Sequence, residues 1–72
     1  MKKEDALIKI GLKIKEIREN KNIPQQDLAA ACNFEKSNMS RIESGRSNLT
    51  IGTLLTICSV LKVKLAEVVD VE

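Results

Sequence analysis

The polar side chains around Met39 are the part of the sequence whose types and spacing could carry out recognition chemistry. Met39 and Ile42 stand three residues apart, so both turn toward the same side of a short helix. The other side chains of that helix face outward and are small, polar or cationic: Lys36, Ser37, Asn38, Ser40 and Arg41. The major groove of DNA accepts such a helix, and its base edges offer hydrogen-bond partners to these side chains. The segment is therefore a candidate for contacting double-stranded DNA.

Catalytic and metal-binding chemistry find little support in the composition. The chain contains no His, which removes the commonest general base. Cys32 and Cys58 are isolated and fall within apolar helical patterns, which is typical of small buried hydrophobic residues in a reducing cytosol rather than of a zinc site. No nucleophile stands in a pattern with a base. We therefore expect neither enzymatic activity nor a cofactor.

Length and composition predict one folded domain over residues 1–72. Hydrophobic residues make up 43% of the chain, which favours a packed core over a disordered tail. Phe34 is the only aromatic residue, and this argues against binding to single-stranded nucleic acid, which uses aromatic stacking. The N-terminus is charged and no apolar run reaches the length of a membrane span, so we expect a cytoplasmic protein without a membrane partner.

The charge is small and unevenly placed. The formal net charge is +2, and residues 22–50 balance to zero because three cationic residues meet three acidic ones: Lys36, Arg41 and Arg46 against Asp27, Glu35 and Glu43. The candidate DNA-contacting segment is therefore not a basic patch. Binding to DNA would have to come from individually placed contacts more than from a general positive field.

Two short helices joined by a tight turn are predicted at the centre of the chain. The first is expected over residues 24–32 and the second over residues 36–44. Asn33 follows the first helix at a position that suits a positive φ, and Gly45 follows the second as a terminating glycine. This pattern predicts a helix-turn-helix.

Further helices are expected on both sides of this pair. A frayed leader at residues 1–5 precedes a helix over residues 6–21, in which Gly11 would allow close packing against a neighbouring helix. Thr50 is expected to cap a fourth helix, and a last short helix is expected over residues 64–69. The fourth helix is expected to be the most buried element because its apolar residues cover a wide arc: Ile51, Leu54, Leu55, Ile57, Cys58 and Leu61.

Taken together, these residues resemble the Xre and phage Cro–repressor helix-turn-helix family. The matching segments are Ile10-Gly-x-x-Ile14-x-x-Ile17-Arg18, Gln25-x-Asp27-Leu28-Ala29, Asn33-Phe34 and Met39-Ser40-Arg41-Ile42-Glu43-x-Gly45. The resemblance extends from about Ile10 to Val69. It implies an all-α, compact five-helix lambda-repressor-like domain and a sequence-specific transcriptional regulator, acting as a repressor or autoregulator, whose third helix enters the major groove.

The resemblance also implies roles for individual residues. It assigns base reading to Lys36, Ser37, Asn38, Ser40 and Arg41, and phosphate binding to Gln25, Gln26, Ser44, Arg46 and Asn48. It pairs Arg18 with Glu43 as an ion pair that ties the first helix to the third. Three positions depart from the family pattern. Pro24 stands where Ser, Thr or Asn usually caps the second helix, Glu35 where Ser or Thr caps the third, and Lys62 where a Gly often ends the fourth.

A domain this small is expected to bind a palindromic operator as a homodimer, with half-sites about 34 Å apart. The segment 64–72 is a candidate dimerisation element because it is richer in apolar side chains than a small core requires: Leu65, Val68, Val69 and Val71. Closure of the core by the same residues is the alternative.

Two other functions stay open, an antitoxin-type protein-interaction module and a controller of a restriction–modification operon. The segment Arg46-Ser-Asn-Leu-Thr-Ile51 resembles the latter.

Overall fold

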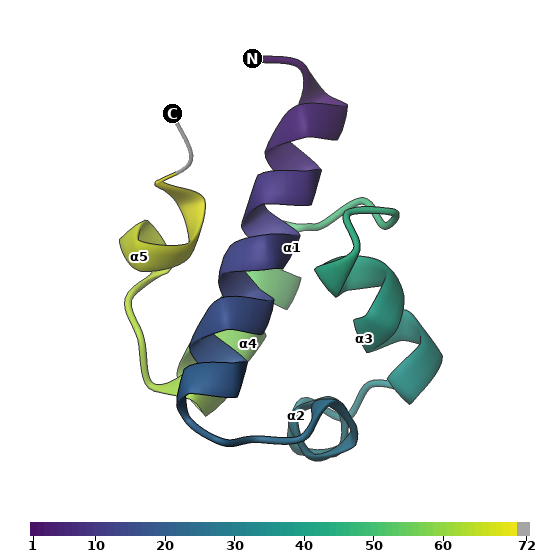
Figure 1. Ribbon diagram of the computed structural model, residues 1–72, viewed down its shortest axis with the longest axis vertical. Helices are drawn as coiled ribbons and strands as arrows, with labels where there is room; N and C mark the ends of the chain where they lie inside the picture. The colour runs from purple at the N-terminus through teal and green to yellow at the C-terminus, as the bar shows by residue number, and fades with distance from the viewer. Residues whose placement is uncertain (71–72) are drawn as a thin grey trace.

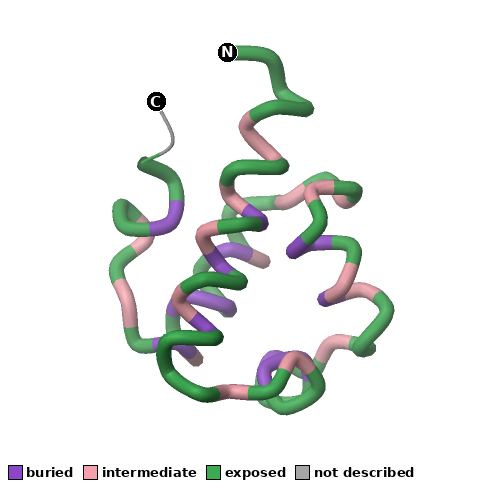
Figure 2. Tube along the Cα trace, in the orientation of Figure 1, coloured by how far each residue is buried: buried purple, intermediate pink, exposed green. Residues whose placement is uncertain are grey.

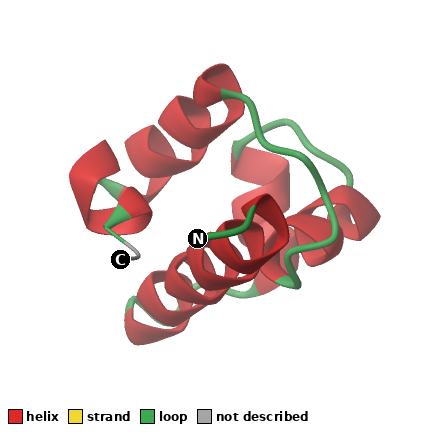
Figure 3. Ribbon diagram, turned by 90° about the horizontal axis from the view of Figure 1, so that it is seen from above, coloured by secondary structure: helices red, strands yellow, loops and turns green. Residues whose placement is uncertain are grey.

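A computed structural model of the protein describes residues 1–70, and these form five helices without a strand. The helices are α1 (Lys3–Asn20), α2 (Gln25–Ala31), α3 (Lys36–Glu43), α4 (Ile51–Leu61) and α5 (Leu65–Val69). The long helix α1 passes in front of α4, with α2 and α3 on one side and α5 on the other (Figure 1). The view from above shows the same separation of α5 from the helix-turn-helix pair (Figure 3). The predicted all-α architecture with five helices is confirmed.

The helix α1 starts three residues earlier than the periodicity predicted. It begins at Lys3, so a frayed leader over residues 1–5 is wrong for residues 3–5, and only Met1 and Lys2 precede the helix. Two effects extend it. Glu4 and Asp5 lie in the first turn, where acidic side chains interact favourably with the helix dipole. The backbone N–H of Ala6 also donates to the carbonyl of Lys2 at 3.0 Å.

The turn between α2 and α3 has the geometry that the sequence predicted. Asn33 adopts a φ of 61°, and the backbone N–H of Phe34 donates to the carbonyl of Ala29 at 2.8 Å. These features close the end of α2 in a Schellman motif, which satisfies carbonyl groups that the helix leaves free. Gly45, with a φ of 77°, ends α3 in the same way. Pro24 was predicted to be the first residue of α2 but is its N-cap residue, without a side-chain hydrogen bond, and the helix begins at Gln25.

The core lies where α1, the helix-turn-helix and α4 meet (Figure 2). Its buried hydrophobic residues are Ile14, Leu28, Ala29, Cys32, Met39, Ile42, Leu54, Ile57, Cys58, Leu61 and Val68. Gly11 brings the backbone of α1 against α3, because a Cβ atom there would lie 2.5 Å from the carbonyl oxygen of Ile42 and 2.6 Å from that of Glu43. The close approach of α1 and α3 therefore requires a glycine at this position.

The helix α4 contributes more buried residues than any other of the five helices, as predicted, but its apolar arc is not fully covered. The Thr50 hydroxyl caps it by accepting from the backbone N–H of Thr53 at 3.1 Å, as expected. However, Ile51 is 61% exposed and Leu55 is 50% exposed, so the wide apolar arc extends beyond the core. Apolar periodicity defines a face of a helix but does not tell how much of that face other helices cover. The exposed residues leave an apolar surface on α4.

The helix α5 closes the core, which corrects the predicted dimer surface. Val68 is fully buried within the single chain, and Leu65 packs against the core. Val68 is therefore not available to a partner, whereas the half-buried Leu65 keeps part of its surface exposed while α5 packs on α1 and α4. Val69 is 37% exposed, and Val71 lies outside the described residues. Among the helices of the described part, none has both the length and the apolar character that crossing a membrane requires.

Candidate nucleic-acid interface

The outward face of α3 presents polar side chains on a helix that is firmly anchored from within. Met39 is fully buried and Ile42 is 1% exposed, which fixes the rotation of the helix about its own axis. Of the residues predicted to read bases, Lys36, Ser37 and Arg41 are exposed, whereas Asn38 and Ser40 are half-buried at the edges of the same face. Within residues 1–70, neither Lys36 nor Arg41 takes part in an ion pair. Their charges are therefore free to meet a ligand.

The end of α3 carries a hydrogen-bonded polar group. The Ser44 hydroxyl donates to the carbonyl of Arg41 at 3.1 Å and accepts from Nε of Arg46 at 3.0 Å. This bond holds the Arg46 guanidinium beside the helix end while its two terminal nitrogens keep their donors for other partners. Asn48 follows in the same loop and is exposed. Of the residues predicted to bind phosphate after α3, Ser44 and Arg46 thus lie together at the end of the helix.

An ion pair between Arg18 and Glu43 joins α1 to α3. Arg18 Nε donates to Glu43 Oε2 at 2.7 Å, and its Nη2 donates to Oε1 at 3.0 Å, so the predicted pair forms and is bidentate. Arg18 is 7% exposed and Glu43 is 4% exposed. Donation of these hydrogen bonds to the Glu43 carboxylate raises the pKa of Arg18 above its usual value. Arg18 Nη1 also donates to the carbonyl of Ile23 at 2.8 Å, which fixes the segment leading into α2.

Gln25 belongs to this ion-pair network, which the sequence did not indicate. Its Nε2 donates to Glu43 Oε1 at 3.0 Å, and its side chain is only partly exposed at the first residue of α2. The amide therefore has a fixed position, with one N–H left to donate. Gln26 beside it is exposed. Gln25 and Glu43 lie 18 positions apart, and neither periodicity nor a local motif signals a contact at that separation.

The Cys, Asp and Glu side chains are the remaining groups that could bind a metal or act as nucleophiles. Among residues 1–70, no group of three or more potential metal ligands comes together. Cys32 and Cys58 are buried free thiols, and burial raises the pKa of both, so they stay protonated at neutral pH. Glu35 sits at the start of α3 without forming a side-chain cap, which leaves its carboxylate exposed near the outward face.

Comparisons with known proteins agree with this geometry. A family model described as helix-turn-helix, HTH_3, matches residues 14–68. The restriction–modification controller protein C.Esp1396I has a similar structure, with 39% sequence identity, coverage of 82% of this chain and 77% of that chain, and a TM-score of 0.77. The controller protein C.AhdI from Aeromonas hydrophila is 26% identical, with coverage of 86% of this chain and 94% of that chain, and a TM-score of 0.83.

A third solved structure has a similar fold. The clp gene regulator ClgR from Corynebacterium glutamicum is 24% identical, with coverage of 94% of this chain and 84% of that chain and a TM-score of 0.83, and this likeness concerns the fold alone. A search of curated protein sequences found no match. The family match covers most of the chain and includes α2, the turn and α3. The chain therefore belongs to the HTH_3 family of Xre and Cro-like helix-turn-helix proteins and is a DNA-binding transcriptional regulator.

Proposed function

We propose that the protein recognises a specific operator by inserting α3 into the major groove, with Arg41 contacting guanine. The supporting observation is the outward face of α3, on which Arg41 and Lys36 are exposed and without an ion-pair partner among residues 1–70. A guanidinium donates two parallel hydrogen bonds, and guanine O6 and N7 are the matching pair of acceptors. Lys36, Ser37, Asn38 and Ser40 supply the remaining donors and acceptors along the helix.

Phosphate contacts on both sides of α3 would set its depth and register in the groove. Gln25 offers its remaining amide N–H at the start of α2, where Glu43 holds the side chain in place, with Gln26 beside it. After α3, Arg46 and Asn48 offer donors, and Ser44 holds the Arg46 guanidinium in place by accepting from its Nε. Such contacts position a protein on DNA without reading its sequence. Since the net charge is only +2, non-specific affinity is expected to be modest.

We also propose that the protein acts as a homodimer on a palindromic site. Ile51 and Leu55 stand four residues apart on α4, so their exposed side chains form one apolar surface. This surface takes the place of the buried Val68 as the dimer contact, and the half-buried Leu65 and the exposed Val69 lie on the neighbouring α5. A sedimentation measurement at tens of micromolar should show a dimer, and Leu55→Glu should yield a folded monomer. A wild-type monomer at that concentration would contradict this proposal.

A more specific role is supported by two of the structural relatives. The controller proteins C.Esp1396I and C.AhdI are 39% and 26% identical to this chain, and both alignments cover most of both chains. We propose that the protein controls a restriction–modification operon by acting on the promoter that drives transcription of its own gene. A reporter driven by that promoter should respond when the protein is expressed in trans. An unchanged reporter would contradict the controller role and leave DNA recognition itself untouched.

Selection of bound duplexes from a random pool tests operator recognition. The wild-type protein should enrich a palindromic site, and Arg41→Ala should lose the preference at one base position in each half-site. That loss corresponds to about 1–3 kcal/mol of discrimination. Enrichment of an identical site by both proteins would refute the role of Arg41. No enrichment by the wild type would instead favour a module that binds protein, such as an antitoxin.

A further inference from the structure

A hollow lies between α1 and α3 beside the outward face. It has a volume of about 240 Å³ and is lined by Leu12, Lys15, Gln25, Ser40, Glu43 and Ser44. Ser40 and Ser44 stand one helical turn apart on α3, and both border the face that carries Lys36 and Arg41. Gln25 marks the start of α2. The hollow therefore adjoins α3 and the start of α2, where the proposed function places the DNA backbone.

The chemistry of the lining suits an anion. Glu43 is the only acidic residue in it, and its charge is already balanced by Arg18, with both carboxylate oxygens occupied. Gln25 Nε2 also donates to this carboxylate, which adds to its neutralisation. The donors that remain are the ammonium group of Lys15, the hydroxyl of Ser40 and one amide N–H of Gln25, because the Ser44 hydroxyl already donates to the carbonyl of Arg41. Lys15 is exposed and forms no ion pair within residues 1–70, so the hollow carries a net positive charge.

We propose that this hollow binds a phosphate of the DNA backbone, with Lys15 of α1 as its principal cation. The inference rests on the proposed function and extends the DNA contact surface from the helix-turn-helix to α1. A phosphate seated there would meet the Lys15 ammonium from one side, and the Ser40 hydroxyl and the remaining amide N–H of Gln25 from the other. Leu12, which is 57% exposed at the rim, offers an apolar surface to the adjoining sugar. The family model begins at residue 14 and so includes Lys15, whereas the family resemblance assigns DNA contacts only to residues from Gln25 onward.

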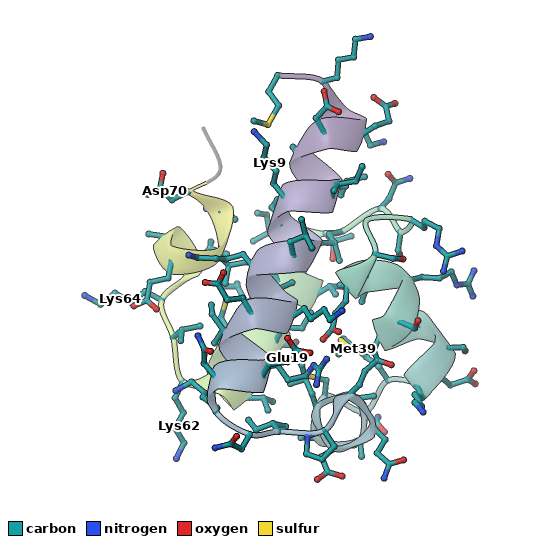
Figure 4. The ribbon with its side chains drawn as sticks, in the orientation of Figure 1. Lys9, Glu19, Met39, Lys62, Lys64 and Asp70 are labelled. Atoms are coloured by element: carbon teal, nitrogen blue, oxygen red, sulfur yellow. The ribbon has the colours of Figure 1, made fainter. Side chains whose placement is uncertain are left out.

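The salt dependence of DNA affinity tests the role of Lys15. Each phosphate contact to duplex DNA contributes a slope of about −0.9 to log K against log salt. The Lys15→Gln variant should therefore flatten the slope by about 0.9 for each protomer bound, and weaken binding to operator and random duplex by the same factor. Lys15→Arg should restore the wild-type slope. The matched control is Lys64→Gln, which removes the same charge from a side chain on the side of the molecule away from α3 (Figure 4).

The outcomes separate this inference from the proposed function. A slope for Lys15→Gln equal to that of Lys64→Gln would overturn the Lys15 contact, while enrichment of an operator by the wild type would keep the proposed function intact. If the wild type binds no duplex at all, both fail together. A loss confined to one base position would also overturn the inference, because a phosphate contact carries no sequence information. Unchanged circular dichroism will show that each variant is folded, as expected for an exposed residue.

Discussion

Replacement of Glu43 by Gln tests how the recognition helix is held in place. The substitution keeps the shape of the side chain but removes the charge that Arg18 meets at 2.7 Å and 3.0 Å. Because Arg18 is 7% exposed, its guanidinium would remain buried beside a neutral amide. Breaking a buried ion pair by removing one partner costs about 3–5 kcal/mol. The Gln side chain keeps one acceptor oxygen, so we expect a loss near the lower limit, about 3 kcal/mol.

A loss of this size is large for such a small domain. Chains of this length rarely exceed about 3–5 kcal/mol of unfolding free energy. At roughly 4–8 °C for each kcal/mol, the melting temperature should fall by about 12–24 °C. Thermal unfolding followed by circular dichroism measures this directly, together with the denaturant midpoint.

An exposed ion pair in α1 supplies the matched control. Lys13 Nζ lies 3.6 Å from Glu16 Oε1, with side chains that are 42% and 63% exposed. Such a pair contributes about 0.2–0.5 kcal/mol, so Glu16→Gln should change the melting temperature by only a few degrees. Equal melting temperatures for Glu43→Gln and Glu16→Gln would refute the structural role of the buried pair. The double variant Arg18→Met/Glu43→Leu should recover most of the loss, because no unpaired charge is left inside.

Three further substitutions or conditions follow from the backbone and the core. Gly11→Ala should destabilise the protein by about 1–3 kcal/mol, because the new Cβ would lie 2.5 Å from a carbonyl oxygen of α3. This loss outweighs the better helix propensity of Ala and is measured by denaturant titration. A stabilised variant would contradict the close approach of the two helices. Lys62 has a φ of 59°, which glycine adopts without strain, so Lys62→Gly should raise the unfolding free energy by up to about 1 kcal/mol. A lower unfolding free energy would show that the Lys62 side chain matters more than the backbone conformation. Burial raises the pKa of Cys32 and Cys58, so the unfolded chain releases these protons first as pH rises above about 8.5. The free energy of unfolding should therefore fall above that pH, and it should fall less steeply when both residues are Ala.

Local signals in the sequence predicted the features that depend on neighbouring residues. The positive φ of Asn33, the termination at Gly45 and the cap by Thr50 all appear in the structure. Each depends on the backbone geometry of a few consecutive residues, which residue type strongly constrains. The place of the Arg18–Glu43 pair came from the family resemblance, because no local rule connects residues 25 positions apart.

Features that depend on how helices cover one another could not be predicted in this way. Val68 and Leu55 are both apolar residues on helices, yet the first is fully buried and the second is 50% exposed. The apolar composition predicted that the wide arc of α4 is buried and that α5 forms a surface for a partner. Only the packing of α5 on α1 and α4 decides which apolar residues the single chain uses. The bond from Gln25 to Glu43 likewise requires α2 and α3 to be in place relative to each other.

A titration of single-base variants of the selected operator tests direct reading by Arg41 most directly. Each half-site position is changed in turn, and affinity is measured for the wild type and for Arg41→Ala at one fixed salt concentration. The wild type should lose about 1–3 kcal/mol when the contacted guanine is replaced, whereas Arg41→Ala should bind both duplexes equally at that position and still discriminate at the others. If Arg41→Ala keeps the full wild-type preference at every position, Arg41 does not read a base and α3 does not recognise DNA in the way proposed.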